Sequence, residues 1–138
     1  MQAAHIVLVS TACLALAGCT AAPPPEPAAS LTTSKVCAFH NSGFAYAGGS
    51  PPQPDIITMD NDGGWCGHLN VSVHGSLVFG EQMHVVHQPL HGQVAIAVES
   101  HGTRVLYRPN PDFTGDDSFS VRDATFNITL PYNVVVVR

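Results

Sequence analysis

The stretch from His91 to Val121 places the strongest constraint on how this chain folds. Two short segments of alternating apolar and polar residues lead into a Pro109–Pro111 corner, and a third alternating segment follows Gly115. Proline restricts φ and glycine accepts positive φ, so local chemistry bends the chain between strands without help from a core. The stretch therefore predicts consecutive β-strands joined by a rigid corner.

The same alternation recurs along the rest of the chain. It is clearest at residues 69–74, 94–98 and 126–136, and shorter candidates lie at 36–39, 56–59 and 83–87. No long segment after residue 30 has the 3.6-residue period of an amphipathic helix, and Gly, Pro, Asn and Asp separate the apolar runs. This pattern predicts an all-β sandwich rather than an α/β fold, with a closed barrel as the alternative.

The first 18 residues have the features of an export signal. Residues 6–17 form an apolar run that is too short to span a bilayer as a helix. The run ends in Leu16-Ala17-Gly18-Cys19, which resembles the lipobox of bacterial lipoproteins. The resemblance implies that residues 1–18 are a signal peptide and that Cys19 is acylated, the alternative being an uncleaved hydrophobic tail. Lipoproteins of two-membrane bacteria that are retained at the inner membrane carry Asp directly after the acylated cysteine. This chain has Thr20 there, so the resemblance implies the periplasmic side of the outer membrane.

A proline-rich tether follows the lipidation site. Residues 20–30 read TAAPPPEPAAS, a composition that favours extended polyproline II and a semi-rigid spacer. We therefore divide the chain into a signal peptide (1–18), a lipidated cysteine with its Pro/Ala-rich tether (19–33) and one domain (34–138). A domain of that length buries a modest core, which a covalent cross-link would strengthen.

Cysteine usage follows from this export prediction. Cys13 leaves with the signal and Cys19 carries the lipid, so Cys37 and Cys66 remain as a pair in an oxidising compartment. We expect a structural disulfide between them, because neither cysteine belongs to a CxxC motif of the kind that redox-active cysteines form.

A longer resemblance covers the segment on which the fold prediction began. It comprises PLHGQV at residues 89–94, GT at 102–103, LYRPNP at 106–111 and FTGDDSF at 113–119. These segments resemble bacterial Ig-like, cadherin-like domains. The resemblance implies an Ig-like Greek-key β-sandwich of about seven strands and a structural or adhesive role outside the cytoplasm. We expect Phe113 to fold under the corner and Asp116 or Asp117 to accept backbone hydrogen bonds there. The chain departs from this pattern at residues 36–70 and in carrying a single copy on a lipid anchor.

Histidines are the residues most suited to a metal site. All but His5 of the eight histidines lie after Cys19, and neutral imidazole is a common ligand of transition metals. The candidate ligands are His68, His74, His87 and His91. On a strand, His84 and His87 would point to opposite faces, and His91 already belongs to the Ig-like pattern. Surface histidines without metal are the leading prediction, and a zinc or copper site is the alternative.

Other activities have less support in the sequence. The segment Asp60–Gly63 looks like the start of a calcium loop, but Val71 stands where an EF-hand requires Glu. No G-x-S-x-G motif occurs, so we predict no enzymatic activity and no cofactor. The formal charge of −5 disfavours nucleic-acid binding.

The leading functional prediction combines the two resemblances. It is a non-enzymatic, membrane-anchored periplasmic lipoprotein whose Ig-like domain is a structural or protein-interaction module. Its expected partners are the membrane, through the lipid anchor, and an envelope protein, as for an accessory subunit of a cell-envelope assembly. The alternative is a His-rich periplasmic lipoprotein that binds zinc or copper.

Overall fold

The computed structural model describes residues 31–41, 51–70, 83–99, 102–124 and 127–138. These residues form eight β-strands and no helix, which confirms the prediction of an all-β fold. In chain order the strands are β1 (Cys37–His40), β2 (Asp55–Asp60), β3 (Cys66–Asn70), β4 (Met83–His87), β5 (Gly92–Glu99), β6 (Gly102–Pro109), β7 (Gly115–Asp123) and β8 (Ile128–Val137). Within the described part of the chain, no helix is long and apolar enough to cross a membrane.

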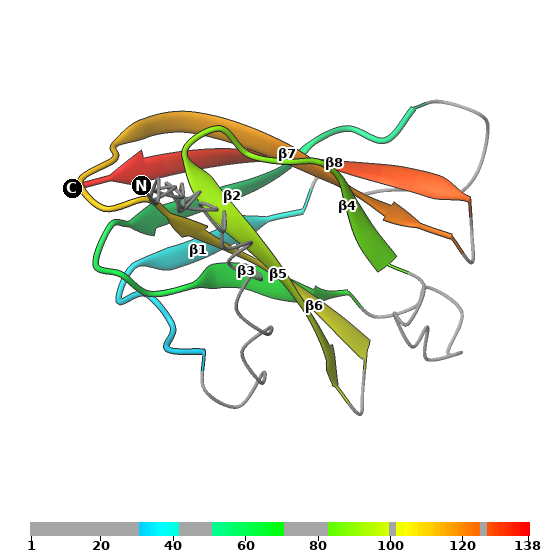
Figure 1. Cartoon of the computed structure of the whole chain (residues 1–138), viewed down its shortest axis with the longest axis horizontal. Coiled ribbons are helices and arrows are strands. Elements are labelled where there is room, and N and C mark those ends of the chain that lie inside the picture. Colours follow the sequence, from blue (N-terminus) through cyan, green and yellow to red (C-terminus); the bar gives the residue numbers. More distant parts are fainter. Residues whose placement is uncertain (1–30, 42–50, 71–82, 100–101, 125–126) are drawn as a thin grey trace, which may run out of the picture.

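The strands form two sheets that pack against each other as a β-sandwich (Figure 1). One sheet has five strands in the order β1-β2-β8-β7-β4, and the other has three in the order β3-β6-β5. The pairing of β2 with β8 is parallel, whereas the other strand pairings are antiparallel. The described residues thus contain eight strands instead of about seven, because the segment before β3 forms two strands that pair with each other.

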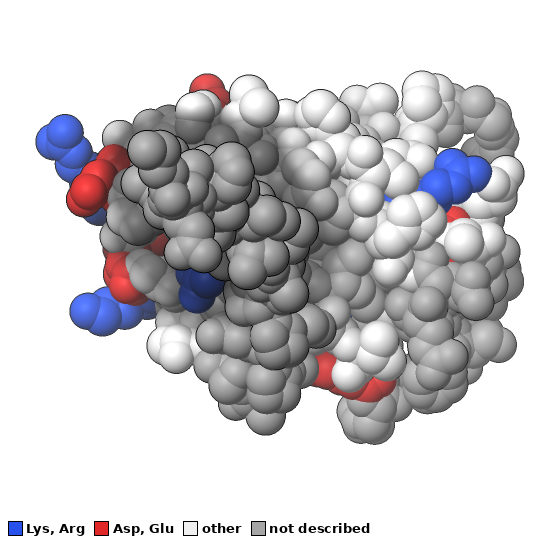
Figure 2. All heavy atoms as spheres, viewed as in Figure 1, with Lys and Arg blue, Asp and Glu red and all other residues white. Residues whose placement is uncertain are grey.

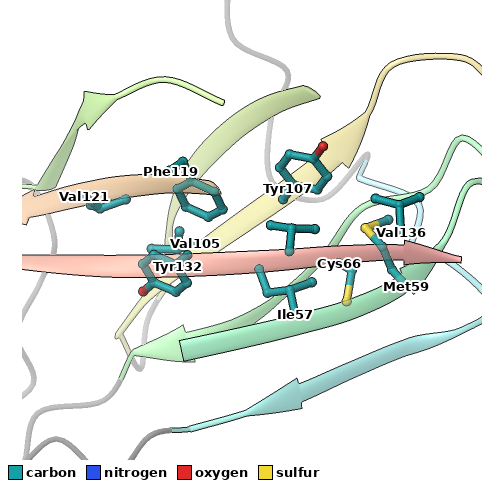
Figure 3. Packing of buried hydrophobic residues seen from close by; sticks show 10 residues of the cluster. Ile57, Met59, Cys66, Val105, Tyr107, Phe119, Val121, Tyr132 and Val136 are labelled. Atoms are coloured by element: carbon teal, nitrogen blue, oxygen red, sulfur yellow. The ribbon is translucent and has the colours of Figure 1, made fainter. Parts of the chain in front are cut away.

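Alternation along the strands places one side chain in two between the sheets (Figure 3). The central core residues come from both sheets and are Ile57, Met59, Cys66, Val105, Tyr107, Phe119, Val121, Tyr132, Val134 and Val136. The rings of Tyr107, Phe119 and Tyr132 lie nearly parallel, with centroid separations of 6.0 Å and 4.7 Å along the series. Because Tyr107 belongs to β6 and the other two rings to β7 and β8, this stack joins the two sheets.

Pro131 lies in β8, which has a neighbour on both sides over much of its length. Its partner in β7 is Ser120, whereas the pairing with β2 begins only one residue later, at Tyr132. The missing N–H of proline therefore falls where β8 has a single neighbour. Because proline cannot donate to a sheet ladder, Pro131 is accommodated at a local edge within a central strand.

The disulfide between Cys37 and Cys66 is present, with Cα atoms 5.3 Å apart, and this prediction is confirmed. Cys37 begins β1 and Cys66 begins β3, which are edge strands of different sheets. The bond therefore closes one side of the sandwich covalently. The opposite side carries the other two edge strands, β4 and β5, joined by residues 88–91.

Ordered packing begins before the expected start of the domain at residue 34. The Trp65 N–H donates to the Thr32 carbonyl at 2.8 Å, and the Ser34 N–H donates to the Trp65 carbonyl at 2.9 Å. The Ser34 hydroxyl is buried and donates to the Val36 carbonyl at 2.9 Å. Thr32 and Ser34 thus belong to the folded domain through backbone hydrogen bonds to Trp65, although their composition resembles that of a linker.

Candidate functional site

A cluster of polar contacts surrounds the Asp117 carboxylate, near the start of β7. Oδ2 accepts hydrogen bonds from the Tyr107 hydroxyl at 2.9 Å and from the His91 N–H at 2.8 Å. Oδ1 accepts from the N–H groups of Leu90 at 3.0 Å and Ser118 at 2.9 Å. One side chain therefore joins β7, the end of β6 and the β4–β5 connection. We call these five residues the Asp117 corner.

Electrostatics at the Asp117 corner favour a fixed negative charge. Partial burial by itself would raise the pKa of Asp117, but the N–H groups of His91, Ser118 and Leu90 and the Tyr107 hydroxyl outweigh it, so the pKa lies below its usual value. Burial and the hydrogen bond to Asp117 raise the pKa of Tyr107. A carboxylate that already has four donors and a phenol that resists ionisation are suited to holding strands together, not to transferring protons.

The segment Asn110–Phe113, between β6 and β7, is fastened to the same end of the sandwich. The Asn61 side-chain amide donates to the carbonyls of Asn110 at 2.8 Å and Phe113 at 2.9 Å. The Phe113 ring stacks on His91 with centroids 4.4 Å apart, and Asp112 adopts a positive φ of 63°. The structure thus contains both features expected near this corner. Phe113 folds back onto His91, and Asp117 accepts hydrogen bonds from backbone N–H groups.

His68 sits in β3 and is stacked on Phe39 of β1, with ring centroids 3.8 Å apart. Burial lowers its pKa, so the neutral imidazole is favoured. Its Nδ1 atom is buried and has no hydrogen-bond partner among the described residues. This setting is that of a packed core histidine facing an aromatic ring.

The relation between His84 and His87 differs from the expectation. The register of β4 with β7 shifts between Val85 and His87, so that His84 lies opposite Arg122 and His87 opposite Ser120. Residues 120 and 122 face the same side of β7, and directly opposite residues share a face, so the two histidines share the outer face of the sheet. The prediction that they point to opposite faces is wrong, because a β-bulge interrupts the two-residue period.

Within the described residues, the candidate metal ligands do not come together in one site. His68 is packed in β3, His87 ends β4, and His91 stacks on Phe113, while His74 lies outside the described residues. In residues 31–41, 51–70, 83–99, 102–124 and 127–138, no group of three or more His, Cys, Asp or Glu side chains is arranged to hold a metal ion.

The segment Asp60–Gly63, considered as a calcium loop, connects β2 to β3. The Asp62 carboxylate accepts hydrogen bonds from the N–H groups of Lys35 at 2.8 Å and Gly64 at 3.0 Å. These backbone contacts, the one from Lys35 foremost, lower the pKa of Asp62. Asp62 thus completes a turn and fastens the segment before β1 to it.

Trp65 marks a surface feature that sequence reasoning did not single out. The indole is 7% exposed, and the Arg108 guanidinium lies 4.5 Å from the ring centroid, a cation–π contact. Beside it is a shallow cavity of about 240 Å³ on the outer face of the three-stranded sheet, lined by Leu31, Thr33, Trp65, Ala97, Glu99, Arg104 and Leu106. The sequence signal was the single tryptophan, whose backbone pairs with that of Thr32 and Ser34 and whose ring is covered by Arg108.

Among the described residues on the face shown in Figure 2, charged side chains are few. Figure 2 shows blue and red groups mainly towards the ends and the lower border, with mostly uncharged atoms among the described residues between them. The closest ion pair is Arg104 with Glu99, 2.8 Å apart on the outer face of the three-stranded sheet. The visible described surface therefore presents no basic patch of the kind that binds nucleic acid.

Comparisons with known proteins leave the chain without an assigned family. No protein-family model, curated protein or solved structure matches it. The predicted lipidation residue, Cys19, lies outside the described residues.

Proposed function

We propose that this chain is a non-enzymatic lipoprotein, anchored through Cys19 to the periplasmic face of the outer membrane, whose domain is an Ig-like protein-interaction module. The observation that carries the domain assignment is the strand order. In an Ig domain the sheets contain strands in the orders A-B-E-D and C-F-G. Taking β2 to β8 as A to G, the order β3-β6-β5 corresponds to B-E-D, and β4-β7-β8 corresponds to C-F-G.

The first strand supports the proposal in a modified form. β2, in the place of strand A, pairs in parallel with β8 rather than with β3, and β1 adds an edge strand beyond it. This departure lies within residues 36–70, where the sequence also departs from the Ig-like pattern. A sandwich in which the Asp62 and Asp117 carboxylates are engaged by backbone N–H groups fits a module that presents surfaces and edges to other proteins.

The anchoring part of the proposal rests on the lipobox sequence. Each buried CH₂ contributes roughly 0.8 kcal/mol, so two or more acyl chains hold a protein stably on a membrane. The proline-rich residues between Cys19 and the domain would then set its distance from the bilayer.

Acyl labelling tests the anchor. The full chain, expressed in a bacterium with two membranes and fed a labelled fatty acid, should carry the label and sediment with the outer membrane. Cys19→Ala should abolish labelling, whereas Cys13→Ala, the matched control in the signal region, should leave it unchanged. A parent chain without label, or a labelled Cys19→Ala variant, contradicts the anchoring proposal.

Cross-linking tests the interaction role. Intact cells treated with a membrane-permeable cross-linker and extracted in mild detergent should yield adducts of this chain that are larger than the monomer. Recovery of the monomer alone contradicts the interaction role. The metal-binding alternative is tested separately by elemental analysis of untagged protein, in which stoichiometric zinc or copper would replace the present proposal.

A further inference from the structure

The four sheet edges of the sandwich are protected to different degrees. β1 and β3 are short and are tied to each other by the Cys37–Cys66 disulfide. β4 has five residues and a bulge, which interrupts any added ladder. β5 has eight residues, pairs with β6 in unbroken register, and contains no proline, lysine or arginine. Within the described residues, β5 is therefore the edge best suited to accept another strand.

Exposed apolar side chains gather on the same side of the sandwich. Among the described residues, six large hydrophobic side chains are exposed, and three of them belong to β4, β5 and their connection. These three are Val86 at 48%, Leu90 at 81% and Val98 at 48%. Exposed apolar residues along an open sheet edge are typical of an interaction surface.

The sequence of β5 is complementary to itself when two copies run antiparallel. Side chains that lie directly opposite each other on paired strands share a face of the sheet. A two-fold symmetric pairing of two β5 strands therefore places one residue opposite its own copy, with the symmetry axis between the two. With Ile96 on the axis, Val94 meets Val98 of the second copy on the core-facing side. On the outer face, Ala95 meets Ala97 and Gln93 meets Glu99. Every cross-strand pair is then apolar with apolar, small with small, or polar with acidic.

The outer-face polar groups are already oriented for this pairing. The Arg108 guanidinium donates to the Gln93 side-chain oxygen at 3.0 Å, so the Gln93 amide N–H groups are directed away from that contact. The Arg104 guanidinium holds Glu99 at 2.8 Å. In the symmetric pairing the Gln93 amide of one copy donates to the Glu99 carboxylate of the other. This hydrogen-bond complementarity favours a second copy of the chain over a strand of unrelated sequence.

We infer that two copies of this chain pair edge to edge through β5, antiparallel about Ile96, to form a continuous six-stranded sheet. The inference rests on the proposed function and names the partner as the chain itself. One strand pair is a small interface, and confinement of both copies to one membrane surface raises their effective concentration.

Val98→Lys tests the edge. Val98 is half exposed in the single chain, so lysine is tolerated there, but in the pair it would face Val94 of the second copy beside the core. Native mass spectrometry of the full chain in mild detergent, over a wide range of concentration, should show a dimer whose Kd rises at least about tenfold in the variant. Val137→Lys, also at an exposed valine but in β8, should leave the Kd unchanged. A monomeric parent chain or an unaffected Val98→Lys dimer overturns the inference.

A cross-link tests the register. Differently tagged copies carrying Gln93→Cys or Glu99→Cys should be joined by a short bis-maleimide, which adds one cysteine thiol at each end, only when the two variants are mixed. Copies carrying the same substitution place their cysteines about 20 Å apart along the paired strands. Cross-links within either variant alone overturn this register.

The inference and the proposed function can fail separately. An acyl-labelled chain that stays monomeric but cross-links to another protein overturns the inference, while the proposed function stands. A dimer of a chain without label at Cys19 supports the inference and contradicts the proposed anchor.

Discussion

Asp117→Asn removes a charge that four hydrogen-bond donors share between the two sheets. Asparagine has the same shape and keeps one acceptor oxygen, so the variant tests the charge and not the packing. A hydrogen bond to a charged group contributes roughly 1.5–3 kcal/mol. Water can replace the contacts to the exposed Leu90 and His91, so the Tyr107 hydroxyl carries most of the loss. We expect the free energy of unfolding to fall by about 2 kcal/mol, and the melting temperature by about 10 °C.

Urea unfolding followed by fluorescence of the single, buried Trp65 measures this loss. The transition midpoint should fall while the slope of free energy against urea stays constant. The control is Asp116→Asn, because Asp116 is exposed and receives no side-chain hydrogen bond within the described residues. A double-mutant cycle with Tyr107→Phe should give a coupling of about 1 kcal/mol. The reasoning is refuted if both aspartate variants are equally stable or if the coupling is absent.

The pH dependence of the stability difference between the parent chain and Asp117→Asn gives an independent check. The pKa of Asp117 is lowered in the folded protein from the ordinary value of 3.8, so its contribution is complete above that value. The contribution is lost as the pH falls through the lowered pKa, because protonation then removes the charge. The stability difference between the parent chain and Asp117→Asn should therefore be constant near neutral pH and narrow under acidic conditions. A difference that widens on acidification contradicts this assignment.

Three further predictions concern the scaffold, each measured by urea unfolding. The Cys37→Ser/Cys66→Ser double variant should lose roughly 3–4 kcal/mol, and a parent chain treated with reductant should match it; a loss below about 1 kcal/mol contradicts a stabilising disulfide. Gly67→Ala should lower stability by several kcal/mol, since a Cβ atom there would meet the Val105 backbone oxygen; unchanged stability would refute that clash. Asn61→Ala should cost roughly 1–2 kcal/mol through two lost hydrogen bonds, and wild-type stability would show that solvent replaces both.

The strands were predictable from the sequence where one face is buried and the ladder is unbroken. In β5 and β8 the alternation of apolar and polar residues gave the correct strand type and the correct inward faces, as for Val134 and Val136. In β4 the same rule gave the wrong relation between His84 and His87. A bulge depends on the pairing with β7, which local sequence does not contain.

The candidate site was predictable only in part, for a related reason. The sequence indicated an aspartate accepting backbone hydrogen bonds at the corner, and Asp117 does so. Two of its backbone donors, however, lie 26 and 27 residues away, and the Tyr107 hydroxyl comes from another strand. Trp65 was missed because its backbone pairs with residues 32–34, which resemble a linker in composition.

The position of the disulfide determines how the domain would respond to mechanical tension. A pull on the chain before β1 reaches Cys37 and passes through the sulfur atoms directly into β3 at Cys66. The chain between the two cysteines, which are 29 positions apart in the sequence, contains the rest of β1 and all of β2; it is then bypassed and cannot be drawn out. Reduction would instead load the pairing of β1 with β2, and after it the parallel ladder of β2 with β8, whose six residue pairs would be sheared together. The oxidation state of one bond thus selects which strands resist stretching.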